Sequence, residues 1–372
     1  MLDTGWVVSL VLTLLAPCAL AGISLINCGL TKSRSAAHSL LTSLVTAATA
    51  MLLYFVVGQL WEPNRSDGAA LLSLFAIGLT AVIPAGAAAE RWRLGAAVIS
   101  TMLLAGVVWP AFAHLVWGAG LLARRGFVDA GGASTIHAVG GLTALAVTRI
   151  LGPRHGKYGD AGIPAAIPGH SAPYVLFGCF VSWIGWIGMN GAGAILFANQ
   201  SPGAIPLVAT RTTLAAVAAL LAAVATTRLR FGKVDASLCS NGWISGLVAS
   251  SAGCASLRAS TMILVGIAAG VLVVFSVEWL ELHFKTDDPG GVISVHGVAG
   301  LLGVVVVGQP IQLGGAAILI AVILPAVYAL NWVLNRVLPQ RIPPETEQQG
   351  ADLHELGAGA YPDFQSYNEE LW

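Results

Sequence analysis

Residues 136–142 read IHAVGGL and residues 295–301 read VHGVAGL, so one pattern occurs twice: aliphatic, histidine, small, valine, small, glycine, leucine. Each copy lies in a long stretch without charged residues, His137 in the fifth helix and His296 in the tenth helix that these stretches predict. Five is an odd number, so two halves of five segments would cross a membrane in opposite orientations, as inverted repeats do. The repeat therefore predicts that the two histidines meet near the membrane midplane.

The composition supports membrane insertion of these stretches. Hydrophobic residues make up 56% of the 372-residue chain and charged residues 10%, where about 25% is usual. Mean hydropathy is +0.79. A bilayer core of roughly 30 Å needs about 20 apolar residues per helix. On this basis eleven transmembrane helices are expected from the charge-free stretches 4–31, 35–61, 68–89, 94–123, 130–148, 161–210 (two helices), 236–257, 259–277 and 289–335 (two helices).

The placement of the basic residues predicts the orientation. With the N-terminus outside, thirteen Lys and Arg residues fall in inner loops and four in outer ones, which is the bias that membrane proteins show. We therefore expect an all-α integral membrane protein with its N-terminus outside and its C-terminus inside. A five-plus-five inverted repeat and a final helix would fill residues 1–338, and residues 339–372 would form a cytoplasmic tail. The equal numbers of acidic and basic residues, 18 each, argue against nucleic-acid binding.

The paired histidines favour a transport role over the alternatives. An ionisable group at membrane depth is costly and usually faces a protein interior or a water-filled path. A packing role remains the structural alternative for each histidine. A metal site needs three or four ligands, and no carboxylate or thiol stands three or four positions from either histidine, so no metal or other cofactor is expected. The chain also lacks a nucleophile–base set, so it is not expected to be an enzyme.

Five further motifs carry a family resemblance. They are GAAAER at 86–91, AHLVWG at 113–118, DAGGASTIH at 129–137, WIGMN at 186–190 and DDPGGVISVHG at 287–297. Across nearly the whole chain these motifs resemble the ammonium transporter (Amt/Mep/Rh) family, in particular its Amt branch. The resemblance implies a homotrimer in the cell inner (plasma) membrane, in which each protomer is a channel for ammonium or ammonia with its own pore through the lipid bilayer.

The resemblance also implies roles for individual residues. Trp117 looks like the aromatic residue of the outer vestibule that attracts the cation by its ring face, although an interfacial belt tryptophan is the alternative. Asp129 looks like the buried acid that precedes the first histidine. By its position before Gly-Gly it is an N-cap, which is favoured over direct ammonium coordination. His137 and His296 would line the pore and pass neutral ammonia, because a bare cation pays a large desolvation cost there.

The sequence departs from the family pattern at the outer mouth. Two stacked phenylalanines are usual, but the first falls on Ala76, with Phe75 beside it as the candidate, and the second on Ala209. Thr213 is expected to line the outer site. Arg211 replaces an asparagine, and an arginine within a membrane helix costs about 2.5–3.5 kcal/mol unless it is paired or reaches the headgroups. It would either reach those headgroups or project into the vestibule or a subunit interface, where it would modulate ammonium recruitment.

These departures keep two functions open. The first is ammonium or ammonia transport, which the histidine pair favours. The second is an Amt-like sensor or receptor that binds ammonium with little or no conduction, which the missing phenylalanine and Arg211 favour. By the resemblance, the tail would pack on the inner face of a neighbouring protomer and could receive a PII-type regulatory protein.

Overall fold

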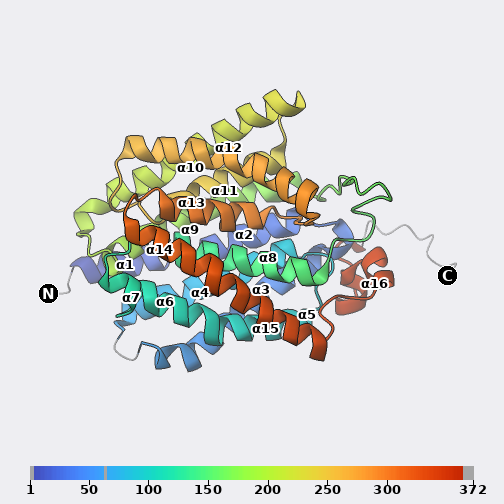
Figure 1. Ribbon diagram of the computed structural model, residues 1–372, viewed down its shortest axis with the longest axis horizontal. Helices are drawn as coiled ribbons and strands as arrows, with labels where there is room; N and C mark the ends of the chain where they lie inside the picture. The colour runs from blue at the N-terminus through green and yellow to red at the C-terminus, as the bar shows by residue number, and fades with distance from the viewer. Residues whose placement is uncertain (1–3, 63–64, 363–372) are drawn as a thin grey trace.

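The chain folds as a helical bundle with α1 at one end and α16 at the other (Figure 1). The computed structural model describes residues 4–62 and 65–362. The α-helices are α1 Thr4–Thr13, α2 Pro17–Gly29, α3 Ala36–Val57, α4 Asp67–Ala87, α5 Leu94–Leu103, α6 Trp109–Trp117, α7 Leu121–Arg124, α8 Val139–Leu151, α9 Ala172–Leu196, α10 Ile205–Phe231, α11 Ala236–Ser250, α12 Ala259–Phe284, α13 Ala299–Val305, α14 Pro310–Ile318, α15 Leu324–Val337 and α16 Pro344–Gln349. The described residues contain no strand, only two isolated bridges.

Several helices continue through short turns of other helical types. Five π-helical segments are η3 Leu104–Val108, η4 Ala133–Ala138, η6 Ile293–Val298, η7 Leu319–Ile323 and η8 Asp352–Leu356. Three 3₁₀ turns are η1 Ser33–Ser35, η2 Gly58–Leu60 and η5 Pro202–Ala204. The π-turns η3 and η7 each join two α-helices into one long run, so single crossings are built from several pieces.

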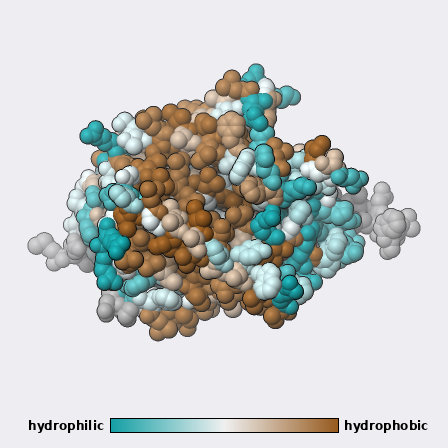
Figure 2. Space-filling view, viewed as in Figure 1, coloured by the Kyte–Doolittle hydropathy of each residue, from teal (hydrophilic) through white to brown (hydrophobic). Residues whose placement is uncertain are grey.

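Within the described ranges, nine helices or continuous helical runs are long and apolar enough to cross a membrane. Figure 2 shows the matching surface, a broad hydrophobic band between two hydrophilic ends. The expectation of an all-α membrane protein is therefore confirmed. Two further elements are shorter: η6 with α13 is a brief apolar helix, and α11 has 15 residues. Most residues of α11 are buried, including Ser240, Asn241 and Ser245, since a helix enclosed by protein can carry polar side chains.

Buried charges hold together the end of the bundle at which the C-terminal tail lies, which we call the inner end after the orientation expected from the sequence. Arg154, which follows α8, donates from Nε to Asp287 Oδ2 at 2.8 Å and from Nη2 to Oδ1 at 3.0 Å. Its Nη1 reaches Glu90 Oε1 at 2.6 Å, and Arg91 Nη2 donates to the Asp287 carbonyl at 2.7 Å. Glu90, Arg154 and Asp287 are each at most 4% exposed. The ends of α4, α8 and α12 are thereby joined by one ionic cluster.

The C-terminal tail lies against this inner end. Asp352 Oδ1 accepts from the backbone N–H of His38 at 2.7 Å, and Glu347 Oε1 accepts from that of His155 at 2.6 Å. Arg341 donates to Glu347 Oε2 at 2.7 Å and to the Leu151 carbonyl at 2.9 Å. The described part of the tail thus contacts helix ends and loops of its own chain. Residues 363–372 of the predicted tail lie outside the described residues.

Candidate functional site

Both histidines lie in π-helical segments whose first backbone N–H groups bond to the side chain of an aspartate a few residues earlier. His137 is in η4 and His296 in η6. Asp129 Oδ2 accepts from the backbone N–H groups of Ser134 at 3.2 Å and Thr135 at 2.9 Å. Asp288 Oδ2 accepts from Ile293 N–H at 2.8 Å. The first N–H groups of a helix have no partner within it, so each carboxylate supplies one. The N-cap residue of η4 is Gly132, so Asp129 is not the N-cap itself but bonds the first N–H groups of the helix from three positions earlier.

The two aspartates extend the sequence repeat beyond what the histidine motif alone suggested. Residues 129–137 read DAGGASTIH and residues 288–296 read DPGGVISVH, so both copies follow the pattern Asp-x-Gly-Gly-x-x-x-x-His. Aligning the residues before each histidine would have revealed it. In both copies the second carboxylate oxygen, Oδ1, is buried without a hydrogen-bond partner in the described residues. The repeat therefore supplies a matched acid to each half.

Glycines let the two histidine helices approach through their backbones. A Cβ placed on Gly141 would lie 2.2 Å from the backbone nitrogen of Gly297, and one on Gly300 would lie 3.0 Å from that of Ala138. Gly141 and Gly300 occupy the same position of the repeat, as do Ala138 and Gly297. The contacts are thus reciprocal, as a two-fold relation between the halves requires. The repeat accordingly brings both motifs to one crossing point.

The histidine side chains meet at this crossing. Nδ1 of His137 lies 3.3 Å from Nδ1 of His296, and the ring centroids are 5.2 Å apart. His137 also stacks on Trp186, with centroids 4.9 Å apart and planes 9° from parallel. Both histidines are at most 1% exposed, and His137 Nε2 has no partner in the described residues. A hydrogen bond between the two Nδ1 atoms requires one donor and one acceptor, leaving His137 Nε2 available to a small polar molecule.

Trp117 is tied to the segment that leads to His137. Its Nε1 donates to the Asp129 carbonyl at 2.7 Å. The ring of Phe197 stacks on one face, with centroids 4.3 Å apart and planes 8° from parallel. Trp109 approaches edge-on at 6.2 Å between centroids. The half-buried indole is therefore fixed on three sides.

Phe197 is the aromatic residue that sequence reasoning missed. It follows the last residue of α9 as the C-cap. Its place depends on where α9 ends, so no spacing rule in the sequence pointed to it. The candidate Phe75 is half-buried and packs against the main core of the bundle, while Ala76 is fully buried. The ring that covers Trp117 thus comes from α9 and not from Phe75.

Thr213 and Arg211 both lie on α10 and have partners within the protein. The Thr213 hydroxyl accepts a hydrogen bond from Trp183 Nε1 at 3.0 Å. Arg211 Nη1 donates to the carbonyls of Cys254 at 3.1 Å and Ala255 at 3.0 Å. These carbonyls follow the C-terminal end of α11, where a positive charge is favourable. These two carbonyls therefore give the Arg211 guanidinium hydrogen-bond partners within its own chain. The alternatives drawn from the sequence had considered only headgroups, the vestibule and a subunit interface.

The turn that Arg211 contacts also supports the loop of Asp129. The backbone N–H of Gly131 donates to the Ser251 carbonyl at 2.7 Å, and that of Ala130 to the Ala252 carbonyl at 3.3 Å. Residues 251–255 therefore lie between Arg211 and the segment that begins the histidine helix. A change at Arg211 can reach Asp129 through this turn without direct contact.

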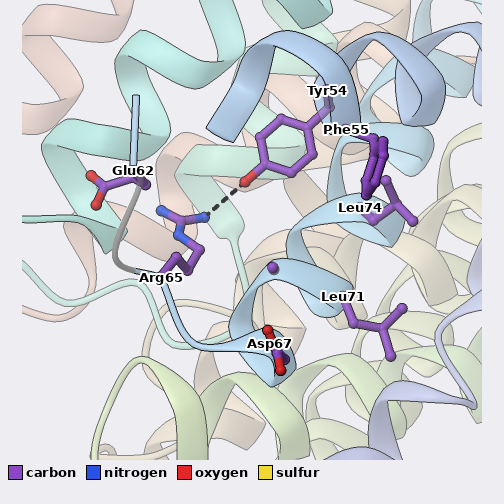
Figure 3. Close-up of a pocket in the computed structure, with 8 residues that line it drawn as sticks. Tyr54, Phe55, Glu62, Arg65, Asp67, Leu71 and Leu74 are labelled. Atoms are coloured by element: carbon purple, nitrogen blue, oxygen red, sulfur yellow. Dashed lines mark hydrogen bonds between the residues drawn. The ribbon is translucent and has the colours of Figure 1, made fainter. Parts of the chain in front are cut away.

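A separate cavity of about 370 Å³ opens between α3 and α4 (Figure 3). Figure 3 shows Tyr54 and Arg65 facing each other, and Arg65 Nη1 donates to the Tyr54 hydroxyl at 3.2 Å. Glu62, which also lines the cavity, contacts Nδ1 of His114 on α6 through its carboxylate. Neither His137 nor Trp117 lines this cavity, so it is distinct from the histidine site.

Metal binding has no candidate site in the described residues. No group of three or more His, Cys, Asp or Glu residues that could hold a metal ion occurs among them. All five cysteines are free, and four of them are buried.

Comparisons with known proteins agree with this architecture. A family model described as Ammonium Transporter Family matches residues 62–361. Ammonium transporter Amt2 of Archaeoglobus fulgidus is 31% identical in an alignment of 409 positions, which covers 94% of this chain and 86% of the relative. A solved structure described as Sensor Amt Protein has a TM-score of 0.88 and 25% identity over 95% of this chain and 98% of its own. Candida albicans Mep2 shares the fold, with a TM-score of 0.82 and 23% identity over 99% of this chain and 92% of its own.

Proposed function

Because this chain belongs to the ammonium transporter family, we propose that it takes up ammonium at an outer aromatic mouth and passes neutral ammonia beside His137 and His296. It is a multi-pass membrane protein, and its relatives are named as transporters rather than enzymes. The observation that carries the proposal is the buried histidine pair, whose Nδ1 atoms are 3.3 Å apart. We place the protein in the cell inner (plasma) membrane.

Recruitment of the cation is assigned to Trp117 and Asp129. A cation over an indole face gains about 0.5–2 kcal/mol, more when it is desolvated. Phe197 covers one face of Trp117, so we assign the opposite face to the ion. Asp129 adds an acid whose Oδ1 has no partner in the described residues. Phe75 and Thr213 remain assigned to the lining of this outer site, although the Thr213 hydroxyl already accepts from Trp183.

The proton must leave before the deep part of the pore. A charged ammonium ion between apolar walls loses its hydration, whereas ammonia is neutral and loses little. His137 Nε2 can accept from or donate to ammonia, and the Nδ1 contact with His296 sets which nitrogen bears a proton. The stack on Trp186 holds the His137 ring in place. The pair therefore supplies polar contacts to ammonia without adding a fixed charge to the path.

The topology that we propose has eleven crossings. The nine long helical runs are completed by α11 and by η6 with α13, which are shorter because neighbouring helices enclose them. Five crossings in each half, inverted in the membrane, account for the reciprocal glycine contacts of the two histidine motifs. With the N-terminus outside, the basic residues Arg91, Arg154 and Arg341 lie at the inner end, as the positive-inside bias favours.

The assembly and the regulator are proposed from family membership. A homotrimer would leave each protomer with its own pore. A PII-type protein would meet the inner end, where the tail residues Glu347 and Asp352 are bound to backbone N–H groups. Displacing these contacts would be one way for such a partner to act on the bundle.

The test is an ammonium jump on purified protein in liposomes over a solid-supported membrane. The wild type is expected to give a transient current or an internal pH change, and His137→Ala is expected to abolish it. His283→Ala is the matched control, because His283 is exposed at the end of α12. A wild type that gives neither signal at any ammonium concentration, with ammonium binding retained, would rule out transport.

An ammonium sensor or receptor is the second candidate. Two observations favour it: the chain matches a structure described as Sensor Amt Protein along almost its whole length, and Arg211 adds a fixed cation beside the turn that supports the Asp129 loop. Calorimetric ammonium binding without any liposome signal would select this function. Binding together with a signal that His137→Ala removes would select transport.

A further inference from the structure

The hydrophobic surface contains a groove of about 530 Å³ between the last turns of α8 and α12 and the first turns of α15. Its walls are mostly apolar and include Leu145, Leu280, Phe284 and Leu324. In Figure 1, α15 crosses in front of α8, and the groove is lined by both helices together with α12. A groove of this kind on a membrane-facing surface is filled by lipid, because no water is available there to cover it.

Two polar residues mark one end of the groove. Arg149, on the last turn of α8, is exposed, and its Nη1 donates to the Phe284 carbonyl at 2.7 Å, which fixes the guanidinium beside the groove. Thr286 is 3% exposed, and its Oγ1 is buried without a partner in the described residues. Lys285, between Phe284 and Thr286, is exposed as well, but it does not line the groove and its Nζ lies beside Gly162. This end of the groove therefore offers one cation, Arg149, and an unused hydroxyl, that of Thr286.

The nearby acids on α12 are bound to other bases. Glu278 pairs with Arg230 at 2.6 Å, and Glu281 pairs with Lys157. Asp287, next along the chain, is held by Arg154. No carboxylate forms an ion pair with Arg149 or Lys285 within the described residues. The end of the groove is thus positively charged without an internal counter-ion.

We propose that this groove is a binding site for an anionic phospholipid of the inner leaflet. Its phosphate would lie against Arg149 and accept a hydrogen bond from the Thr286 hydroxyl, since guanidinium–phosphate bonds are among the stronger charge-assisted ones. One acyl chain would lie along Leu145, Leu280 and Leu324. Trp279 and Tyr328 line the same groove and are of the kind that anchors at the headgroup level. A zwitterionic lipid fits less well, because no acidic residue lines the groove to pair with its ammonium group.

The site has a structural consequence for the two histidine helices. The turn η4 with His137 leads into α8, whose last turn carries Arg149, and α12 leads through residues 285–292 into η6 with His296. A lipid held between Arg149 and Thr286 connects the inner end of the helix that carries His137 with the segment that leads to His296. The binding itself does not depend on the proposed transport function.

The test measures lipid retention by native mass spectrometry of the full chain in detergent, with phosphatidylglycerol and phosphatidylcholine of identical acyl chains. The wild type should bind phosphatidylglycerol more tightly, and Arg149→Gln should weaken that binding about five-fold, as expected for one lost basic contact at a membrane surface. Arg336→Gln is the matched control, because Arg336 is exposed on α15 but lies over Trp332 and outside the groove. It should leave binding unchanged.

A second variant tests the groove rather than the charge. Leu145→Trp keeps Arg149 and fills the apolar wall, so it should also lower phosphatidylglycerol binding, whereas the soluble headgroup glycerol phosphate should not compete at millimolar concentration. Equal binding of both lipids by the wild type, or unchanged binding in both Arg149→Gln and Leu145→Trp, would overturn the proposal. Competition by glycerol phosphate would overturn it too, because it would assign the site to a soluble anion.

Discussion

The centre of the bundle and its inner end both bury ionisable side chains, but they partner them differently. At the centre, His137 and His296 share one contact, and His137 Nε2 has no partner in the described residues. At the inner end, Arg154 alone makes four hydrogen bonds to acids, counting its backbone N–H to Asp287. A buried polar atom without a partner is costly, so it persists where a ligand can use it, while fully bonded charges hold structure. The comparison therefore assigns ligand contacts to the centre and stabilisation of the fold to the inner end.

The pKa of Asp287 reflects its hydrogen bonds and ion pairs with the arginines of the inner end. Burial alone would raise it, but hydrogen bonds from Arg154 and the charges of Arg91 and Arg154 outweigh burial and lower it to about 2. Burial lowers the pKa of Arg91 to about 10, although the charge of Asp287 opposes this. Both groups remain ionised at neutral pH. The cluster therefore acts as a permanent set of ion pairs.

The largest expected effect is the loss of Arg154. Arg154→Ala leaves Glu90 and Asp287 buried without their main partner, and breaking a buried pair in this way costs about 3–5 kcal/mol. Thermal unfolding in detergent, followed by circular dichroism, should show a large fall in the midpoint. Arg230→Ala is the control, because its pair with Glu278 is partly exposed and should matter little. Equal midpoints for the two variants would contradict the structural role of the cluster.

A smaller effect is expected at the crossing of the histidine helices. In Gly141→Ala the added Cβ meets the Gly297 backbone at 2.2 Å, so the helices must separate, at about 3 kcal/mol for overpacking. Gly95→Ala is the matched control: it lies in α5 with nothing within 4 Å, and alanine there should stabilise the helix by about 0.5–1 kcal/mol. The ammonium signal should fall in Gly141→Ala only. An unchanged signal would show that the histidine spacing tolerates a wider crossing.

The sequence was informative wherever a repeat or a charge gap determined the result. The all-α membrane fold followed from charge-free stretches, and the meeting of His137 with His296 followed from their places in the repeat. Features that depend on where one helix ends against another could not be predicted. Phe197 covers Trp117 because α9 stops at Leu196, and Arg211 reaches the Cys254 carbonyl because α11 stops nearby. Such contacts join residues from different helices, and no single stretch encodes them.

Acid pH should weaken the inner end by a moderate amount. The pKa of Asp287 is about 2 in the folded protein against an ordinary value of 3.8, so its contribution of about 2 kcal/mol is complete above pH 4. That contribution is lost as the pH falls from 4 through 2, when the folded state must also take up the proton. The difference in unfolding free energy between wild type and Asp287→Asn, measured by denaturant titration, should shrink over this range. A difference that stays constant with pH would show that Asp287 keeps its ordinary pKa in the folded protein.

The smallest expected effect concerns the support of Trp117. Stacked aromatic pairs contribute about 0.5–1.5 kcal/mol beyond burial, so Phe197→Leu should weaken apparent ammonium affinity about three- to five-fold by releasing the indole. The maximal signal should not change, because His137 and His296 are untouched, and Phe197→Tyr should restore the affinity. Phe177→Leu is the control, since Phe177 is 61% exposed on the same helix. Tighter binding in Phe197→Leu would mean that the ring blocks the Trp117 face instead of supporting it, and recruitment would then be limited by this cover.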